Sequence, residues 1–357
     1  MARKRRLFEV PGPTVVVTNL ASMPSIDSVI SRLGEEHKKM EYYSFDETLR
    51  NVRTGEAMKL DWDEGKQTYF GTFGGRRLPL GQTCVKTALS FAQIPNAEWL
   101  MGKPHQRLVE TLYDETRRKG GVQVAVNDRE IRAFVPKEFT WLTDHELLVG
   151  VRESLRHYGP MGIQVVQDAE NESVDYRMLF GKSIGPKGDN VYGMLSIRAS
   201  EFALTRNEAS LGLYREICAN GTLTCQNNQT VKWNHRGNKM SFASQMGELL
   251  SGAEGFLEQS GHLLTHAMKT KLSASVYYVL YAMERMEILK PRQVELIKES
   301  ASENNVNTVY DMWNLITDSA KNADLSVRRR IEQSAMNYLE CMVLVNAKAE
   351  QIVFGGD

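Results

Sequence analysis

The spacing of apolar residues changes along the chain and divides it into two parts near residue 240. In the first part, short stretches alternate apolar and polar residues, as in residues 122–126 and 130–135, which flank Asn127-Asp128-Arg129. Alternation that is interrupted by turn residues is typical of β-hairpins. The same pattern predicts further strands at residues 162–167, 174–180 and 191–198.

Helical spacing predicts helices between these hairpins. The expected helices cover residues 25–40, 82–93, 104–119 and 143–157. Ser25 or Asp27 caps the first helix, and Thr143 with Glu146 has the spacing of a capping box at the start of the last. Residues 25–240 are therefore expected to form an α+β core, rich in β-hairpins and packed by helices.

From residue 241 onward, apolar residues recur every three or four positions. The recurrence runs through residues 242–257, 272–283, 306–320 and 327–345. Such spacing is typical of amphipathic helices, so an all-helical C-terminal region is expected over residues 241–357. Residues 1–24, with four basic residues among the first six, are expected to form an irregular basic arm that can contact phosphate.

The composition is that of a globular protein. Of its 357 residues, 42% are hydrophobic and 25% are charged. No apolar run approaches the roughly 18 residues of a transmembrane helix, so no membrane partner is expected. The basic start lacks the apolar stretch of a secretion signal, which predicts a cytoplasmic location, in the host cell if a phage encodes the protein. The four cysteines are too scattered for a disulfide framework.

The net charge is zero, but its distribution is uneven. Residues 1–120 hold 19 Lys and Arg against 15 Asp and Glu, whereas residues 241–357 hold 11 against 15. A basic first part suits contact with DNA, and opposite charges at the two ends suit head-to-tail packing of subunits. Ordinary variation in surface charge explains these numbers equally well.

Two segments resemble catalytic motifs only in part. Gly181-Lys182-Ser183 is similar to the end of a P-loop, but Tyr176 stands where that motif needs its first glycine. His262 and His266 have the spacing of a zinc-protease helix without its glutamate. Neither segment therefore predicts an enzyme.

Metal-binding patterns are equally incomplete. Cys218, Cys225 and His235 could supply three zinc ligands, but their spacing matches no common zinc site. The carboxylates are not clustered as a two-metal nuclease requires. No catalytic residue, metal or cofactor is therefore predicted, and a metal-dependent nuclease is kept as a minor alternative.

Several segments instead combine basic and aromatic residues. Sequence-neutral binding of single strands needs cations that follow the phosphates and aromatic faces on which bases stack. The candidate cations are Arg76, Arg77, Arg129, Arg132, Lys137, Lys182, Lys187, Arg215, Lys232 and Arg236. The candidate stacking residues are Tyr69, Phe73 and Trp233.

One further segment carries a turn pattern. Apolar residues 211–218 have helical spacing, and the pair Asn220-Gly221 follows them. Asn-Gly readily adopts the positive φ angles of tight turns. We therefore assign Asn220 and Gly221 a structural role in a turn.

Four short motifs in this order resemble a known protein family. They are Leu78-Pro79-Leu80-Gly81 with Ile94-Pro95, Arg132-Ala133-Phe134, Arg215 with Cys218 and Asn220-Gly221, and Asn307-Thr308 with Asn314 and Thr317. They resemble a phage- and plasmid-borne family of formerly unknown function, thought to be remotely related to single-strand annealing recombinases of the RecT, Red-beta and Erf type.

The resemblance implies a function that needs no active site. It implies ATP-independent binding and annealing of single-stranded DNA in phage-type recombination, by a homo-oligomeric ring or filament with an exonuclease as a possible partner. The alternative is a non-enzymatic phage structural or host-interaction protein, such as an inhibitor of a defence complex. Zero net charge and the acidic helical C-terminal region favour that alternative.

Overall fold

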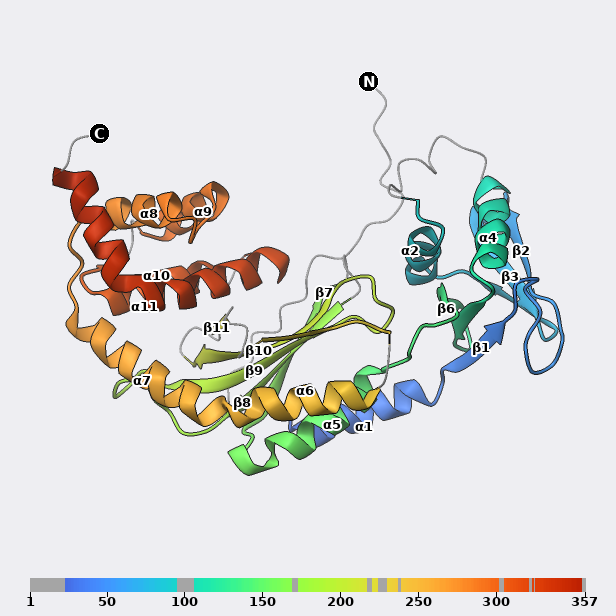
Figure 1. The fold of residues 1–357 in the computed structure, drawn as a ribbon, viewed down its shortest axis with the longest axis horizontal. Helices are drawn as coiled ribbons and strands as arrows, with labels where there is room; N and C mark the ends of the chain where they lie inside the picture. The colour runs from blue at the N-terminus through green and yellow to red at the C-terminus, as the bar shows by residue number, and fades with distance from the viewer. Residues whose placement is uncertain are drawn as a thin grey trace, which may run out of the picture.

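The computed structural model describes residues 23–94, 106–168, 173–216, 220–223, 230–236, 239–301, 305–320, 323 and 325–354. The predicted basic arm lies almost wholly outside these residues. The fold is α+β as predicted, since every paired strand is antiparallel and a helical region follows the strands. Figure 1 shows an elongated arrangement, with a small unit of strands and helices at one end, a sheet in the centre and helices at the other end.

Within its described residues, the N-terminal unit has two small sheets and two helices. Its elements are β1 (Glu41–Phe45), β2 (Lys59–Asp63), β3 (Thr68–Phe73), β4 (Arg76–Pro79), α2 (Gln82–Phe91), α4 (Gln106–Arg118), β5 (Val122–Val126) and β6 (Ile131–Pro136). The strand orders are β1-β5-β6 and β2-β3-β4. The unit has its own apolar core, which includes Phe45, Leu108 and Phe134. The hairpin predicted on either side of residues 127–129 is confirmed as β5 and β6.

The central sheet supplies the scaffold for the rest of the molecule. Its strands are β7 (Gly162–Asp168), β8 (Ser173–Phe180), β9 (Val191–Ala199), β10 (Asn207–Arg215), β11 (Asn220–Leu223) and β12 (Thr230–Trp233). They follow the order β11-β10-β9-β8-β7, and β12 pairs with the first half of β10. The predicted strands at residues 162–167, 174–180 and 191–198 are therefore confirmed.

Residues 211–218 correct one prediction. Their spacing predicts a helix, but residues 211–215 belong to strand β10. Strand β9 pairs along one side of β10, and β11 and β12 pair along the other. Leu211 and Leu213 enter the apolar core two residues apart, as strand alternation requires. A short run of mostly apolar residues fits both the helical and the strand period. Pairing with the neighbouring strands therefore determines that this run is a strand.

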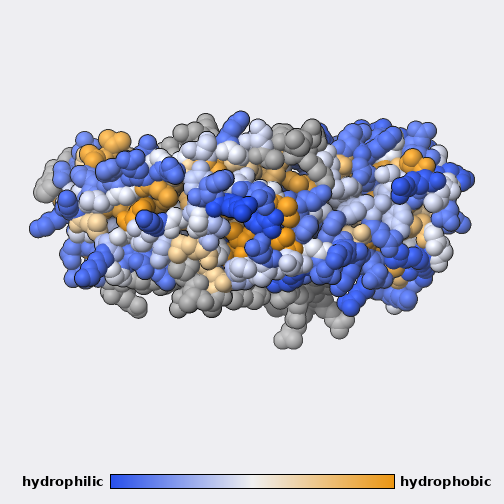
Figure 2. All heavy atoms as spheres, turned by 90° about the horizontal axis from the view of Figure 1, so that it is seen from below, coloured by the Kyte–Doolittle hydropathy of each residue, from blue (hydrophilic) through white to orange (hydrophobic). Residues whose placement is uncertain are grey.

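One face of the central sheet is apolar and is covered by helices α1 (Ile26–His37), α5 (Asp144–Leu155) and α6 (Lys239–Ser251). These helices lie under the sheet in Figure 1. The predicted caps are present, with Ser25 accepting from the Ser28 amide, and Thr143 and Glu146 forming a complete capping box. Seen from that side, the surface is mainly polar, with apolar patches near its centre and toward one end (Figure 2).

The C-terminal region is helical as predicted. It comprises α7 (Ala253–Lys269), α8 (Val276–Arg285), α9 (Pro291–Ala301), α10 (Val309–Ser319) and α11 (Leu325–Phe354). Its buried residues, such as Trp313 and Leu339, join the same core as the central sheet. The change of pattern near residue 240 therefore marks a change of secondary structure within one continuous core. None of the helices in the described ranges is both long and apolar enough to cross a membrane.

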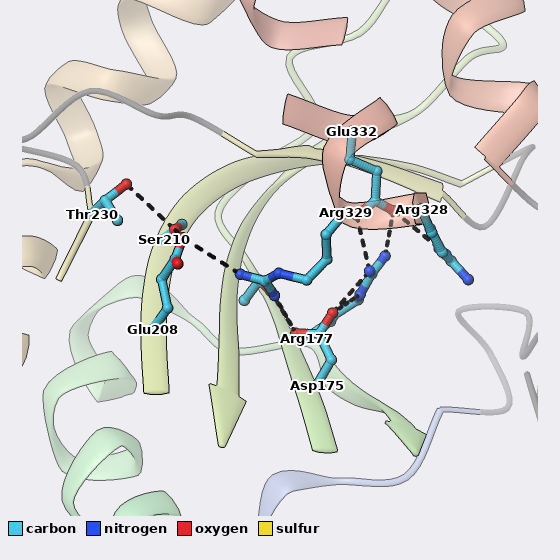
Figure 3. Close-up of polar contacts among 9 residues, drawn as sticks. Asp175, Arg177, Glu208, Ser210, Thr230, Arg328, Arg329 and Glu332 are labelled. Atoms are coloured by element: carbon cyan, nitrogen blue, oxygen red, sulfur yellow. Dashed lines mark hydrogen bonds and ion pairs between the residues drawn. The ribbon is translucent and has the colours of Figure 1, made fainter. Parts of the chain in front are cut away.

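The other face of the central sheet carries buried charges that meet the start of α11 (Figure 3). Both guanidinium NH groups of Arg177 on β8 bond Glu332 on α11, at 2.7 and 2.9 Å. Nε of Arg177 also donates to Asp175 at 2.9 Å. Arg329 donates to Asp175 at 3.0 Å and to the Ser196 hydroxyl at 2.9 Å. This charged cluster fastens α11 to the sheet.

Each charge in the cluster is held by charges of opposite sign. Burial alone would favour the neutral acid, but Arg177 and Arg329 hold the pKa of Asp175 well below its usual range. Burial also opposes the charge on Arg177, but Glu332 and Asp175 raise its pKa above the ordinary value. The side chains of Asp175, Arg177 and Glu332 are 0% exposed. The loss of one partner would leave a buried charge without compensation.

We predict that Glu332→Ala lowers the free energy of unfolding by about 3–5 kcal/mol, because it removes the carboxylate that pairs with both Arg177 and Arg328, which are buried. Chemical denaturation of wild type and variant measures the difference. The matched control is Glu350→Ala on the exposed part of the same helix, for which a change within about 0.5 kcal/mol is expected. Equal losses in the two variants would contradict a structural role for the cluster.

Candidate nucleic-acid interface

The structure does not bring all the predicted binding residues together. Tyr69 and Phe73 on β3 are each only 6% exposed. The ring of Phe73 packs 5.1 Å from Tyr43 and 5.6 Å from Phe45, between ring centroids. Burial raises the pKa of Tyr69 to about 12. These two aromatic rings belong to the core of the N-terminal unit, so the prediction that they stack on bases is wrong.

The predicted arginines beside them are paired with carboxylates. Arg76 lies 3.1 Å from Glu41. Arg77 lies 3.0 Å from Asp61, and its guanidinium group sits 4.1 Å from the centre of the Phe70 ring. Gly74 and Gly75, at φ +57° and +71°, form the turn between β3 and β4, as tight hairpin turns require. This segment is therefore a hairpin with neutralised charges and not an open basic groove.

Arg215 is also engaged in the fold. It forms an ion pair with Asp189 at 2.7 Å, and each side chain is only 13% exposed. The hydroxyl of Tyr310 on α10 donates to the same carboxylate at 2.6 Å. Asp189 thus joins the loop after β8 both to Arg215 on β10 and to Tyr310 of the helical region. This ion pair corrects the prediction of Arg215 as a phosphate contact.

Asn220 and Gly221 lie next to the predicted turn but not in it. Asn220 pairs with Arg215 and Gly221 with Tyr214 in the ladder of β10 and β11. The Asn-Gly pair therefore begins strand β11. Strand pairing overrode the local preference of Asn-Gly for the turn itself.

The remaining predicted cations fall into three places. Lys182 and Lys187 are exposed in the loop between β8 and β9. Arg129 and Lys137 are exposed on and just after the β5–β6 hairpin, while Arg132 on the hairpin is paired with Glu130 at 2.7 Å. The third group consists of Lys232 and Arg236. They lie together in a cleft with the predicted stacking residue Trp233.

This cleft, of 480 Å³, opens along the edge of β12. We call it the basic cleft. Its described lining includes Arg206, Lys232, Trp233, Arg236 and Phe242 and contains no Asp or Glu. Arg206, Lys232 and Arg236 are exposed, and no ion pair joins them to a carboxylate in the described part of the chain. The indole of Trp233 packs 4.8 Å from the Phe242 ring.

The backbone around the cleft is held by β12 and by a buried histidine. Trp233 pairs with Asn207, and Lys232 pairs with Glu208, in the β10–β12 ladder. Two residues after Trp233, His235 is 5% exposed and stacks on Phe139 at 4.4 Å between ring centroids. Its ring nitrogens lie 2.9 Å from Asn207 Nδ2 and 3.0 Å from the Thr140 carbonyl oxygen. The flanking cations are therefore presented from a fixed backbone.

A second cavity of 280 Å³ extends the basic cleft. The two share Ala203, Leu204, Asn234, His235 and Arg236. The second also reaches Phe91, Lys119 and Phe139. Unlike the basic cleft, the second cavity has a carboxylate, Glu138, in its lining.

Arg206 was not predicted from the sequence. It is an isolated arginine after β9, without an aromatic neighbour in the chain. It reaches the cleft only because β10 and β12 bring residues 206 and 232 to the same edge of the sheet. No pattern in the sequence indicates this.

The structure covers only part of the possible zinc site named from the sequence. Cys218 and Cys225 lie outside the described residues. Among the side chains that are described, no three His, Cys, Asp or Glu lie close enough to share a metal ion.

Compared with protein-family models, with curated proteins and with solved structures, the chain has no significant match. The family resemblance therefore rests on the sequence motifs alone.

His235 makes the scaffold of the cleft sensitive to acid. Burial lowers the pKa of His235, although its contacts with the Ser200 and Thr140 carbonyls oppose this. A histidine with a lowered pKa in the folded state is stabilising while neutral, and this stability is lost as the pH falls below its unfolded pKa of about 6.5.

We predict that, between pH 7.5 and pH 5.5, the thermal midpoint of the wild type falls relative to that of His235→Gln, because only the wild type has this buried histidine. Thermal unfolding across that range measures both proteins. The control is His262→Gln, which replaces an exposed histidine and should leave the pH dependence unchanged. Identical pH profiles for wild type and His235→Gln would argue against the buried, neutral ring.

Proposed function

We propose that the protein binds single-stranded DNA in the basic cleft and anneals complementary strands without ATP. The observation that carries the proposal is the lining of the cleft, with three exposed cations, one indole and no described carboxylate. Cations and an aromatic face are what sequence-neutral binding of a single strand needs. Base pairing supplies the free energy of annealing, so the reaction requires no nucleotide hydrolysis.

The geometry also supports binding to the backbone of the strand. Lys232, Trp233 and Arg236 come from one short segment beside a sheet edge, and such rigidly supported segments commonly carry binding residues. Charged contacts to phosphate fix the position of a strand without reading its sequence. Binding in the cleft is therefore expected to depend on salt and only weakly on base sequence.

Assembly into a homo-oligomeric ring or filament is part of the proposal. Helix α8 exposes Tyr277, Tyr278 and Tyr281, at 53%, 44% and 41%. Aromatic residues are enriched at protein interfaces, which supports a contact between subunits at this helix. The proposal also includes an exonuclease as a possible partner, because the family resemblance implies one.

The same tyrosines favour a second candidate function. A protein that binds a host partner, for example to inhibit a defence complex, would also expose aromatic side chains on one helix. This alternative predicts no measurable affinity for DNA at low salt. The two functions are therefore separated by the binding experiment that follows.

We predict that Lys232→Ala combined with Arg236→Ala weakens binding of a labelled single strand and flattens its salt dependence. The slope of log affinity against log salt should fall by about 0.7 for each phosphate that the variant no longer neutralises. Fluorescence anisotropy at several salt concentrations measures both quantities. Lys182→Ala with Lys187→Ala is the comparison pair, and weaker binding confined to that pair would move the site to the β8–β9 loop.

We also predict that the wild-type protein accelerates duplex formation when the complementary strand is added without ATP. The Lys232→Ala, Arg236→Ala variant should lose this acceleration together with strand binding, because the cleft must hold the first strand. Fluorescence energy transfer between labelled strands follows the reaction, and a non-complementary strand is the control. Strand binding without any acceleration would limit the function to single-strand binding.

A further inference from the structure

A separate cavity of 610 Å³ lies beside the N-terminal unit. Its walls come from α1, the β5–β6 hairpin, the start of α5, strand β8 and the segment after β9. We call it the mixed-charge cavity, because it is lined by both cations and carboxyl groups. It has no described lining residue in common with the basic cleft, but it shares Phe202 with the second cavity beside that cleft.

The rim of the mixed-charge cavity carries exposed cations. Arg32 and Lys39 come from α1 and the residues just after it, and Arg129 comes from the turn of the β5–β6 hairpin. Within the described residues, no ion pair joins these three side chains to a carboxylate. Glu36 and Asp128 are also exposed in this lining, but neither forms an ion pair with the three cations. The cations can therefore contact an anionic group such as a phosphate.

The inner wall carries acids and aromatic rings. Asp144 at the start of α5 accepts a hydrogen bond of 2.6 Å from the Tyr176 hydroxyl. The hydroxyl of Tyr42 lies 3.4 Å from Glu201. Phe202, which is 7% exposed, lies next to Glu201 in the lining. Phe202 belongs to a buried apolar cluster, with Arg132 at 5.8 Å from the centre of its ring. The partly exposed carboxyl groups of Asp144 and Glu201 are therefore the groups that this wall offers to a ligand.

The protonation state of Glu201 decides what this wall can bind. Burial and the neighbouring Asp144 raise the pKa of Glu201 to about 8, against the opposing effect of Arg132. The side chain is therefore largely a neutral acid at pH 7. A neutral carboxyl group offers one O–H donor beside one carbonyl acceptor.

We infer that the mixed-charge cavity is a nucleotide-binding site, in which rim cations hold the phosphate and Glu201 bonds the edge of the base. Every nucleobase presents a donor beside an acceptor on its pairing edge, which complements a neutral carboxyl group. The cavity volume lies within the roughly 300–1,000 Å³ of small-molecule sites.

The nucleotide can come from two sources, a free mononucleotide or one nucleotide of a bound strand. Both have the same phosphate and base, so the site recognises the same chemistry in each. The inference does not depend on strand binding in the basic cleft, because the two cavities are lined by different described residues. Variants of one cavity can therefore be tested without changing the other.

The test is calorimetric titration of the full-length protein at pH 7 with nucleoside monophosphates and, as the ligand without a base, ribose 5-phosphate. The expected result is saturable binding of the monophosphates and binding of ribose 5-phosphate at least about tenfold weaker, a difference of about 1.4 kcal/mol. Glu201→Ala should abolish the preference for a base. Glu201→Gln, which keeps a neutral donor and acceptor, should retain it.

Three outcomes would overturn the inference. These are no saturable binding of any monophosphate, equal binding of ribose 5-phosphate, and binding that disappears in Lys232→Ala, Arg236→Ala but persists in Glu201→Ala. Denaturation of Glu201→Ala confirms that the variant is folded. A reduced affinity of Glu201→Ala for a labelled single strand would identify the strand as the source, and an unchanged affinity would identify the free nucleotide.

Discussion

The buried ion pairs between β8 and α11 constrain the rest of the structure. Asp175 and Arg177 lie on the face of the central sheet that the helices α1, α5 and α6 leave uncovered, and Glu332 and Arg329 of α11 neutralise them. Charges with so little exposure are tolerable only when every partner is present. The position of α11 on the sheet is therefore specified by charge pairing as well as by apolar packing.

With apolar packing on one face of the sheet and the charged cluster on the other, the edges of the sheet are left to carry the proposed binding residues. At one edge, β12 pairs with the start of β10 and presents Lys232 and Trp233 beside Arg206. The buried ring of His235 fixes the next turn of the chain. The proposed strand-binding site thus consists of short segments supported by a rigid sheet, which is the usual relation between a scaffold and its functional loops.

The two cavities differ in charge, and this difference suits two kinds of contact with nucleotides. The basic cleft presents cations without carboxylates among its described residues, which favours the repeating phosphates of a strand. The mixed-charge cavity combines cations with Asp144 and Glu201, which suits a single nucleotide that has a charged end and a neutral edge. In both proposals the distribution of charge, and not the net charge of zero, determines the ligand.

Local sequence determined the elements whose signals lie within a few residues. Ser25, the capping box of Thr143 and Glu146, and the β5–β6 hairpin were predicted because caps and turns depend on near neighbours. Tertiary structure alone decided which charged and aromatic side chains are available for binding. Phe73 is buried, Arg215 is paired with Asp189, and Arg206 joins Lys232, because the exposure and charge partners of a residue depend on segments that are distant in the chain.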